Sequence, residues 1–284
     1  MRPLRTCDSA QLNTGVSKCP PDFGKMLGAI LVGANAKLPA NLTADKLEEL
    51  VHADESERIY GIIRFTEYAK NGGEAQTATN GYGPEEFNGF SARKDTYTLN
   101  RFYPELHAAI TRSANTARGV YFFDENNVIY GMNDGTDTLA PFDMACVYSD
   151  ATPHPTSSAK STMSVTFCYL DPKQAVIGFD YAQLDFNPMK LTLGLTEVVL
   201  KKATDSGSAY KLYEKVGGYD VTGIYGPLIV EAGNTVLNGA TSAATYNDVD
   251  NTITIATTGS AAVSLKSPKV LFENGIKGII QVSA

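Results

Sequence analysis

Residues 161–170 carry the pattern that most restricts how this chain can fold. One set of alternate positions holds Met163, Val165, Phe167 and Tyr169, and the other holds Thr162, Ser164, Thr166 and Cys168. Successive side chains of a β-strand point to opposite faces, so this alternation predicts a strand with one face in an apolar core. The other face is small, polar and uncharged, which suits either open solvent or a close-packed, wet surface such as a channel wall.

Other segments with β-branched and aromatic residues extend the same interpretation. Strands are predicted at 26–32, 58–68 and 93–101, and a hairpin is predicted at 119–131, with its turn at Asp124–Asn127. Only two short helices are indicated before residue 190. One follows the N-cap residue Thr43, and the other spans 104–114. The fold class expected is therefore mainly β with two short helices.

The character of the chain changes near residue 190. Residues 191–284 show no helical period and contain short strand-like runs separated by turns rich in Gly, Asn, Asp and Ser. This spacing predicts a small immunoglobulin-like β-sandwich for 191–284, although the Cys, Trp, Cys pattern typical of true immunoglobulin domains is absent.

The sequence patterns define three further segments. Residues 1–25 are polar, flanked by Pro and without periodicity, so we expect an extended arm that becomes ordered on a neighbour. Residues 26–190 are expected to form a β-sandwich or barrel. Within it, residues 69–91 are rich in Gly, Asn and Thr and are predicted to be a long loop, and loops of this length are usually functional or form interfaces.

Charge and composition exclude several classes of protein. The net charge is −7 and no basic run occurs, which argues against a surface that wraps nucleic acid. The longest apolar run, 26–32, is far shorter than the ~20 residues of a membrane-spanning helix, and no export signal is visible. Cys146 and Cys168 lie in separate strand-like runs and are expected to be free thiols, whereas the pairing of Cys7 with Cys19 stays open.

The residues that carry enzyme chemistry are sparse. The three histidines, His52, His107 and His154, stand in a helix end, a helix surface and a Pro-flanked loop. No hydrolase, phosphate-binding or metal-binding motif accompanies them, so we expect no enzyme activity, no cofactor and no metal site. The C-terminal tyrosines are compatible with a sugar-stacking surface or with a sandwich core, and they are Tyr210, Tyr213, Tyr219 and Tyr225.

The order of several segments resembles a known group of proteins. The segments are Cys19-Pro20, 28–32, 37–39, the first helix, 58–67, Gly81–Pro84, Asp124–Asn127 and 161–170. Over residues 1–190 this order is similar to virion structural proteins of tailed bacteriophages and prophages of Bacteroidetes-like hosts. The layout of arm, β domain, long loop and C-terminal sandwich looks like that of a tail tube protein.

The resemblance implies a role without catalytic residues. A tail tube protein forms homo-oligomeric rings that stack around a lumen through which DNA passes without specific binding. The implied partners are further copies of the chain and other tail or neck proteins. Host glycans, contacted weakly, are a further expected partner. The implied location is the virion tail, assembled in the host cytoplasm.

Two sets of residues become candidates for that role. The face expected to line the lumen consists of Thr162, Ser164, Thr166 and Cys168. The residues expected to contact the next ring are Asn71, Gly72, Gly81, Tyr82, Gly83 and Pro84. The alternative is a capsid-decorating or host-adhesion protein whose C-terminal sandwich binds surface glycans. A third class, a hydrolase of the cell envelope, requires paired acidic residues in a cleft, and the sequence locates none.

Overall fold

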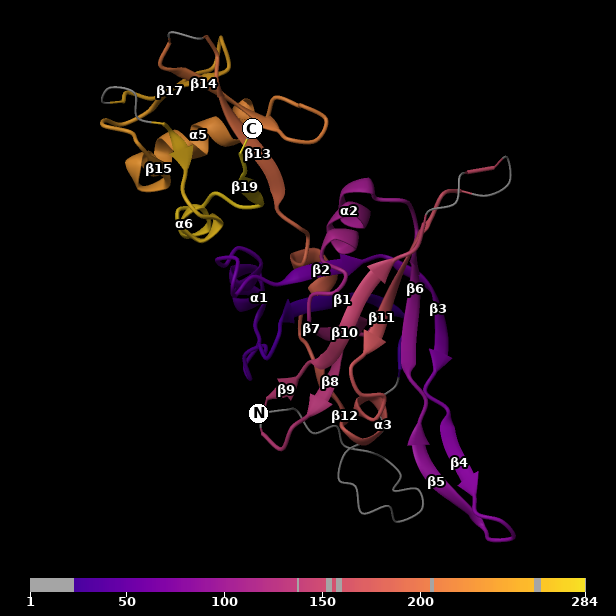
Figure 1. Cartoon of the computed structure of the whole chain (residues 1–284). Coiled ribbons are helices and arrows are strands. Elements are labelled where there is room, and N and C mark those ends of the chain that lie inside the picture. The colour runs from indigo at the N-terminus through magenta and orange to yellow at the C-terminus, as the bar shows by residue number, and fades with distance from the viewer. Residues whose placement is uncertain are drawn as a thin grey trace. The chain divides into compact units, whose positions relative to one another are not determined.

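The fold is mainly β, as the alternating patterns predicted. The computed structural model describes residues 23–136, 138–151, 155–156, 160–204, 207–257 and 262–283. The predicted arm therefore lies outside the described residues except for 23–25, and so do Cys7 and Cys19. Two compact units form (Figure 1): unit 1 holds the described residues up to Leu47 together with Ile59–Thr192, and unit 2 holds Glu48–Arg58 together with the described residues from Leu193 onward.

Unit 1 is built on a ten-stranded sheet. Seven of its strands are neighbours in the order β12-β8-β7-β10-β11-β6-β3, and the other three, β1, β2 and β9, pair outside this order. Its strands are β1 Met26–Gly33, β2 Tyr60–Ile63, β3 Phe65–Gly72, β6 Arg93–Leu99, β7 Arg118–Asp124, β8 Val128–Asn133, β9 Leu139–Ala140, β10 Phe142–Ser149, β11 Met163–Tyr169 and β12 Phe179–Gln183. Its helices are α1 Ala44–Val51, which continues into unit 2, α2 Pro104–Arg112, α3 Gln174–Ile177 and α4 Pro188–Leu191. The two predicted helices correspond to α1 and α2, and the additional short helices α3 and α4 were missed.

Strand β7 is the point at which the sheet of unit 1 divides. It pairs with β1 along its whole length, whereas its other edge pairs with β10 at 118–120 and with β8 at Phe122 and Phe123. The strands therefore curve around a single core that includes Val120, Phe122 and Phe142. The apolar face predicted for 161–170 lies in this core, because Met163, Val165 and Phe167 are 1%, 0% and 0% exposed.

The predicted hairpin at 119–131 is confirmed as β7 and β8. Its turn is held by the buried carboxylate of Asp124, which accepts hydrogen bonds from the backbone N–H groups of Asn126 and Val128, both at 2.9 Å. Asn127 adopts a positive φ of 58°, a conformation that asparagine tolerates better than most residues. The hydroxyl of Tyr130 donates to the same carboxylate, so one aspartate fixes both the turn and the following strand.

The loop predicted at 69–91 is instead a long β-hairpin, and this prediction was wrong. Strand β3 runs to Gly72, and β4 (Ala75–Thr79) then pairs antiparallel with β5 (Glu85–Phe90). Every residue of β4 is exposed, and β5 is exposed over its first four residues. Because neither face is buried in its own chain, no apolar alternation marks the two strands in the sequence.

Unit 2 contains a five-stranded sheet with the order β16-β17-β14-β13-β19, and a separate two-stranded sheet of β15 and β18. Its strands are β13 Thr196–Lys202, β14 Ala209–Glu214, β15 Leu237–Asn238, β16 Thr245–Asn247, β17 Thr252–Thr254, β18 Ser264–Leu265 and β19 Ile279–Gln281. Three helical segments accompany them, namely α5 Thr222–Ala232, the 3₁₀ helix η2 Gly233–Val236 and α6 Pro268–Glu273. β13 and β19 pair in parallel.

Helix α5 corrects the prediction that residues 191–284 lack helices. It packs with the β-sheet around Ile229 and Leu212, both fully buried. The sequence hides this helix because apolar residues occur around its whole circumference and Pro227 stands within it, so no amphipathic period appears. The described residues of unit 2 thus form one main sheet with packed helices, and they do not show the two facing sheets of an immunoglobulin-like sandwich.

Candidate assembly surfaces

The small polar face predicted for 161–170 lies on the side of β11 opposite the core. The register places Thr96 and Thr98 of β6 beside Thr166 and Ser164 on that face, and Tyr148 of β10 beside Thr166 on the other flank. The hydroxyls of Thr96 and Thr166 are 2.9 Å apart and hydrogen-bonded. A band of uncharged hydroxyl side chains therefore crosses three neighbouring strands.

The four candidate lumen residues differ in their accessibility. Thr162 and Ser164 are partly exposed, whereas Thr166 is only 3% and Cys168 only 9% exposed. Thr96 and Tyr148, which flank Thr166 in the sheet, are partly exposed. An alternation in one strand cannot reveal the burial of Thr166 and Cys168, because burial depends also on the rest of the sheet.

Opposite charges mark the edges of the polar face. Lys94 lies opposite Cys168 on β6, and Glu67 lies opposite Thr98 on β3. Both side chains are exposed. The formal charges of these two residues cancel, so together they form no positive cluster of the kind that holds phosphate groups.

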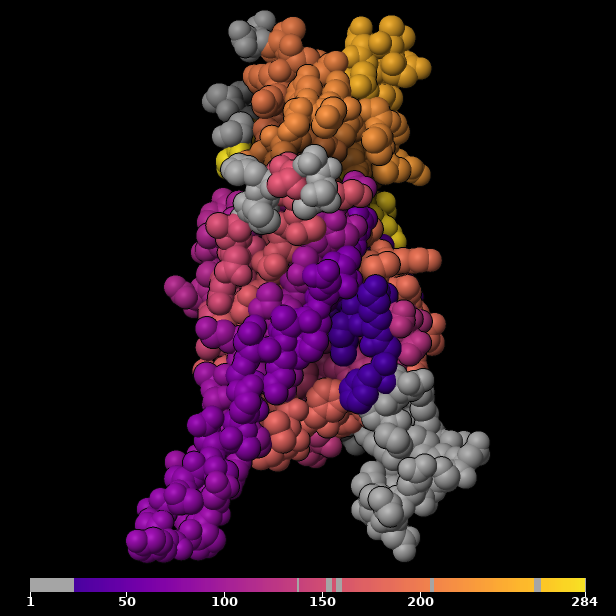
Figure 2. Space-filling view, turned by 90° about the vertical axis from the view of Figure 1, so that its right-hand side faces the viewer, coloured from indigo at the N-terminus to yellow at the C-terminus, as the bar shows by residue number. Residues whose placement is uncertain are grey.

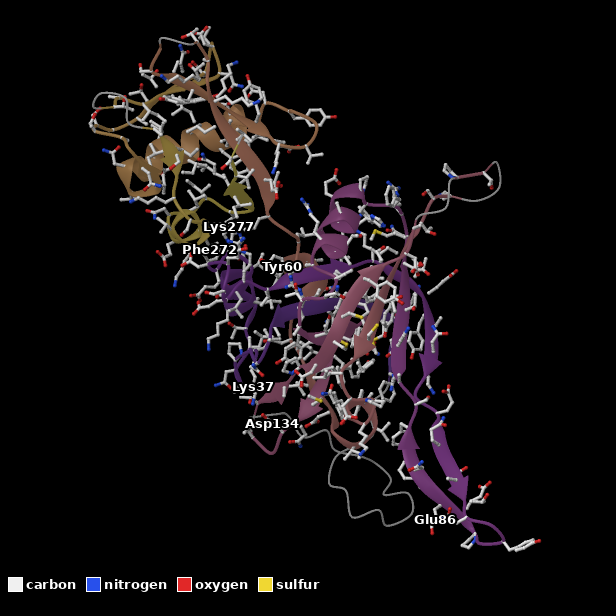
Figure 3. All side chains as sticks on the ribbon, viewed as in Figure 1. Lys37, Tyr60, Glu86, Asp134, Phe272 and Lys277 are labelled. Atoms are coloured by element: carbon white, nitrogen blue, oxygen red, sulfur yellow. The ribbon has the colours of Figure 1, made fainter. Side chains whose placement is uncertain are left out.

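The second surface is the β4–β5 hairpin, which extends beyond the sheet of unit 1 (Figures 1 and 2). Its base is closed by Glu74 and Ser91: the Ser91 N–H donates to the Glu74 carbonyl at 2.9 Å, and the Glu74 N–H donates to Ser91 Oγ at 3.1 Å. Tyr82 at the tip is fully exposed, and Phe87 is 61% exposed. Glu86 adds negative charge near the tip (Figure 3).

The residues predicted to contact the next ring fall at the two ends of this hairpin. Gly81, Tyr82, Gly83 and Pro84 form its tip, where the Gly83 N–H donates to the Asn80 carbonyl at 3.1 Å. Asn71 and Gly72 instead end β3, where they pair with Lys94 and Arg93 of β6. The residues predicted to contact the next ring therefore fall into one group at the tip of the hairpin and one at its base. The exposed side chains of β4 and β5 lie between the two groups.

Strand β3 also provides a free edge. It stands at one end of the strand order of unit 1 and pairs, among the described residues, only with β6, while β12 ends the order on the other side. Six of the eight residues of β3 are exposed in its burial pattern. A free edge presents unpaired backbone N–H and C=O groups, which are a template for pairing with another chain.

A polar cluster on the opposite face of β6 fixes the strands that carry these surfaces. The carboxylate of Asp95 is 2% exposed. It accepts hydrogen bonds from the Arg93 guanidinium at 2.9 and 3.2 Å, from the Tyr169 hydroxyl at 2.8 Å and from the Tyr68 hydroxyl at 3.1 Å. The Arg93 guanidinium also lies over the Tyr169 ring, 4.9 Å from its centroid. This cluster joins β3, β6 and β11.

The environment of the cluster favours uncharged phenols. Burial, reinforced by the negative charge of Asp95, raises the pKa of Tyr169 well above its usual value. Burial likewise raises the pKa of Tyr97, and the same cause raises that of Tyr68. A cavity of 410 Å³ opens beside the cluster, and half of the residues that line it are aromatic, Phe23 and Phe179 among them. Because both oxygens of Asp95 already have partners, we regard the cluster as structural.

The remaining predicted sites are dispersed. His52 is buried in unit 2, His107 accepts or donates a hydrogen bond at the carbonyl of Asp150, 3.1 Å away, and His154 lies outside the described residues. Among the C-terminal tyrosines, Tyr210 is 7% exposed and belongs to the core, whereas Tyr219 is 69% exposed. Tyr210 and Tyr219 therefore do not share one stacking surface.

Two searches of the described residues gave negative results. No group of three or more His, Cys, Asp or Glu side chains in these ranges is arranged to hold a metal ion. None of the helices in the same ranges has the length and apolar character needed to cross a membrane.

Comparison with solved structures shows a weak structural similarity. No family model matches the sequence, and no curated protein matches it either. The fold is similar to the anti-feeding prophage cap, a tube-terminating cap, at 9% sequence identity and a TM-score of 0.27. That similarity covers 61% of this chain and 99% of the cap chain. A similarity of this size assigns neither a family nor a function.

Proposed function

We propose that this chain is a structural protein of a phage tail or tail-like particle, and specifically a tube protein that forms stacked homo-oligomeric rings around a DNA-conducting lumen. The observation that carries the proposal is the β4–β5 hairpin. An isolated two-stranded hairpin is at best marginally stable in water, and this one buries almost none of its side chains in its own chain. Such an element gains stability when another molecule covers it.

The free edge of β3 supplies the complementary part of the proposal. Identical copies can continue the sheet from one protomer to the next, and a closed ring leaves no edge exposed. β3 leads directly into the hairpin through Gly72 and Gly73, so one continuous segment offers both an edge and a protrusion. In this arrangement the edge joins neighbours within a ring and the hairpin tip, with Tyr82, reaches the next ring.

The polar face of β6, β10 and β11 is then assigned to the lumen. DNA that moves through a tube must not be held by its phosphates, and this face presents hydroxyl groups flanked by the opposite charges of Lys94 and Glu67. We keep the partly exposed Thr162 and Ser164 as wall residues and leave out the buried Thr166 and Cys168. The partly exposed neighbours added to the wall are Thr96, Thr98 and Tyr148.

Electron microscopy of the purified full-length chain tests the proposal. We expect rings or short tubes whose abundance rises with protein concentration. A matched variant replaces residues 74–91 by Asn-Gly, a two-residue turn that joins β3 to β6 directly. We expect this variant to lose stacking while it keeps its fold. Val249→Ala, at an 87% exposed position of unit 2, is the control. A wild-type chain that stays monomeric at high concentration contradicts the proposal.

One observation favours a second candidate, a capsid-decorating or host-adhesion protein that acts through unit 2. Tyr219 of this unit is 69% exposed, and an exposed aromatic ring suits weak sugar stacking. Binding of the full-length chain to a glycan array, lost in Tyr219→Ala, supports this candidate. The full chain is needed because a fragment that begins at residue 191 lacks Glu48–Arg58, which belongs to unit 2.

A further inference from the structure

Two free cysteines face each other across neighbouring strands of unit 1. Cys146 of β10 and Cys168 of β11 are direct partners in the antiparallel register. They lie on the polar face described above, Cys168 buried and Cys146 partly exposed.

We propose that Cys146 and Cys168 form a reversible disulfide across β10 and β11, made by exchange with a low-molecular-weight disulfide such as oxidised glutathione. The inference does not depend on the proposed function. Directly opposed residues of an antiparallel pair have Cα atoms about 4.5–5.5 Å apart. That range lies inside the roughly 4.4–6.8 Å that disulfides span, so the backbone already brings the two residues close enough.

The same geometry makes the bond easy to reduce. Opposed Cβ atoms in a sheet are about 4.5–5.5 Å apart, whereas disulfides prefer about 3.5–4.5 Å. A bond across this pair therefore draws the strands together and stores strain, and strained disulfides are the labile ones. The register shift between Met144 and Cys146 gives β10 a local irregularity next to the pair, at which the strand can adjust.

The two thiols have different parts in the exchange. Burial raises the pKa of the Cys168 thiol to about 12, and the neighbouring Cys146 thiol acts in the same direction, whereas the nearby Lys94 opposes it. Cys168 is thus a poor first nucleophile, because the thiolate is the attacking species. The more accessible Cys146 attacks first.

The steps balance as a simple exchange. The Cys146 thiolate attacks one sulfur of oxidised glutathione, which forms a mixed disulfide and releases one glutathione thiolate. Cys168 then loses its proton to solvent or to that thiolate and attacks the sulfur of Cys146, which releases the second glutathione. Two protein thiols are oxidised, and one glutathione disulfide is reduced to two thiols. A dithiol reductant reverses the sequence.

The test uses the full-length chain with Cys7→Ser and Cys19→Ser, which leaves this pair as the only thiols of the four in the sequence. The folded protein is treated with oxidised glutathione, the remaining thiols are alkylated, and the intact mass is measured. We expect loss of both thiols, a mass lower by about 2 Da, no retained glutathione, and full recovery with dithiothreitol. The rate at which the disulfide between Cys146 and Cys168 forms should not change with protein concentration.

Single-cysteine variants in the same background separate the roles. With Cys168→Ser we expect glutathione to stay attached to Cys146, and with Cys146→Ser we expect Cys168 to react much more slowly. If the serine background does not fold, peptide mapping of the oxidised wild-type chain should find the two cysteines linked to each other. Three outcomes would each overturn the proposal. Glutathione could stay attached to Cys146 while Cys168 can still be alkylated, both thiols could fail to react, or the disulfides could form between chains.

Discussion

The imidazole ring of His52 stacks on the ring of Phe272, with centroids 4.5 Å apart. Its Nε2 accepts a hydrogen bond from the Gly278 N–H at 2.9 Å, and its Nδ1 lies 2.8 Å from the Glu48 carbonyl. A neutral imidazole with its proton on Nδ1 satisfies both contacts. His52 therefore joins the early segment Glu48–Arg58 to the C-terminal residues inside unit 2.

Replacing His52 tests this connection. His52→Ala removes the stacking and leaves the Gly278 N–H without its acceptor, so we expect a loss of about 2–4 kcal/mol in the free energy of unfolding of unit 2. Urea unfolding followed by circular dichroism measures it. The control is Lys277→Ala, which removes an exposed ion pair with Glu48 and should lose less than about 1 kcal/mol. Equal effects of the two substitutions would disprove the assignment.

Gly72 is expected to be essential for the base of the hairpin. It has φ 76°, and an added Cβ would stand 1.8 Å from the carbonyl oxygen of Ala92. Gly72→Ala should therefore lose about 2–4 kcal/mol, through backbone strain and a displaced strand. Gly135→Ala is the matched control, because φ is 84° there but nothing lies within 4 Å. Hydrogen exchange of residues 74–91 should accelerate in the first variant only.

Asp95 is expected to be highly sensitive to substitution. Asp95→Ala leaves the half-buried Arg93 guanidinium and the Tyr169 hydroxyl without an acceptor, so we expect a loss of about 3–5 kcal/mol in the free energy of unfolding. Asp220→Ala in unit 2 removes a more exposed carboxylate, paired with Lys211, and should have a much smaller effect. Thermal unfolding of the two variants compares them, and a near-neutral Asp95→Ala would argue against the cluster as a stabilising element.

The buried position of Tyr121 leads us to expect a loss of folding stability at high pH. Its hydroxyl donates to the Leu139 carbonyl at 2.9 Å and accepts from the Leu38 N–H at 3.1 Å. Burial raises the pKa of Tyr121 to about 12. Between the ordinary tyrosine value near 10 and that value, the unfolded chain loses the phenolic proton while the folded chain keeps it.

The contribution of Tyr121 is therefore complete below pH ~10 and is lost as the pH rises toward 12, by up to about 1.4 kcal/mol per pH unit. Urea unfolding of the wild type and of Tyr121→Phe at pH 9, 10 and 11 measures this slope. The variant should lose stability less steeply over the range. Identical slopes would show that Tyr121 ionises equally in both states.

The sequence predicted the elements whose residues face a single core. The alternation at 161–170 and the turn chemistry of Asp124 each reflect local physics that the structure retains. Thr43 is a similar case, since its hydroxyl accepts from the Lys46 N–H at 3.3 Å at the start of α1. Periodicity and capping are visible from one segment alone.

The elements that the sequence missed depend on what lies outside the segment. The hairpin of β4 and β5 has no buried face and so no apolar pattern, and α5 is apolar on all sides. The allocation of Glu48–Arg58 to unit 2 rests on long-range contacts of His52, for which no local signal exists. The burial of Thr166 likewise depends on the order of strands in the sheet.

The central claim is that copies of this chain join through the free edge of β3 and the β4–β5 hairpin. Hydrogen exchange of the full-length protein at low and at high concentration tests it most directly. We predict that protection of peptides covering 65–72 and 75–90 rises with concentration, while that of α5 in unit 2 does not change. Unchanged protection in both segments, or a rise confined to unit 2, would contradict the account.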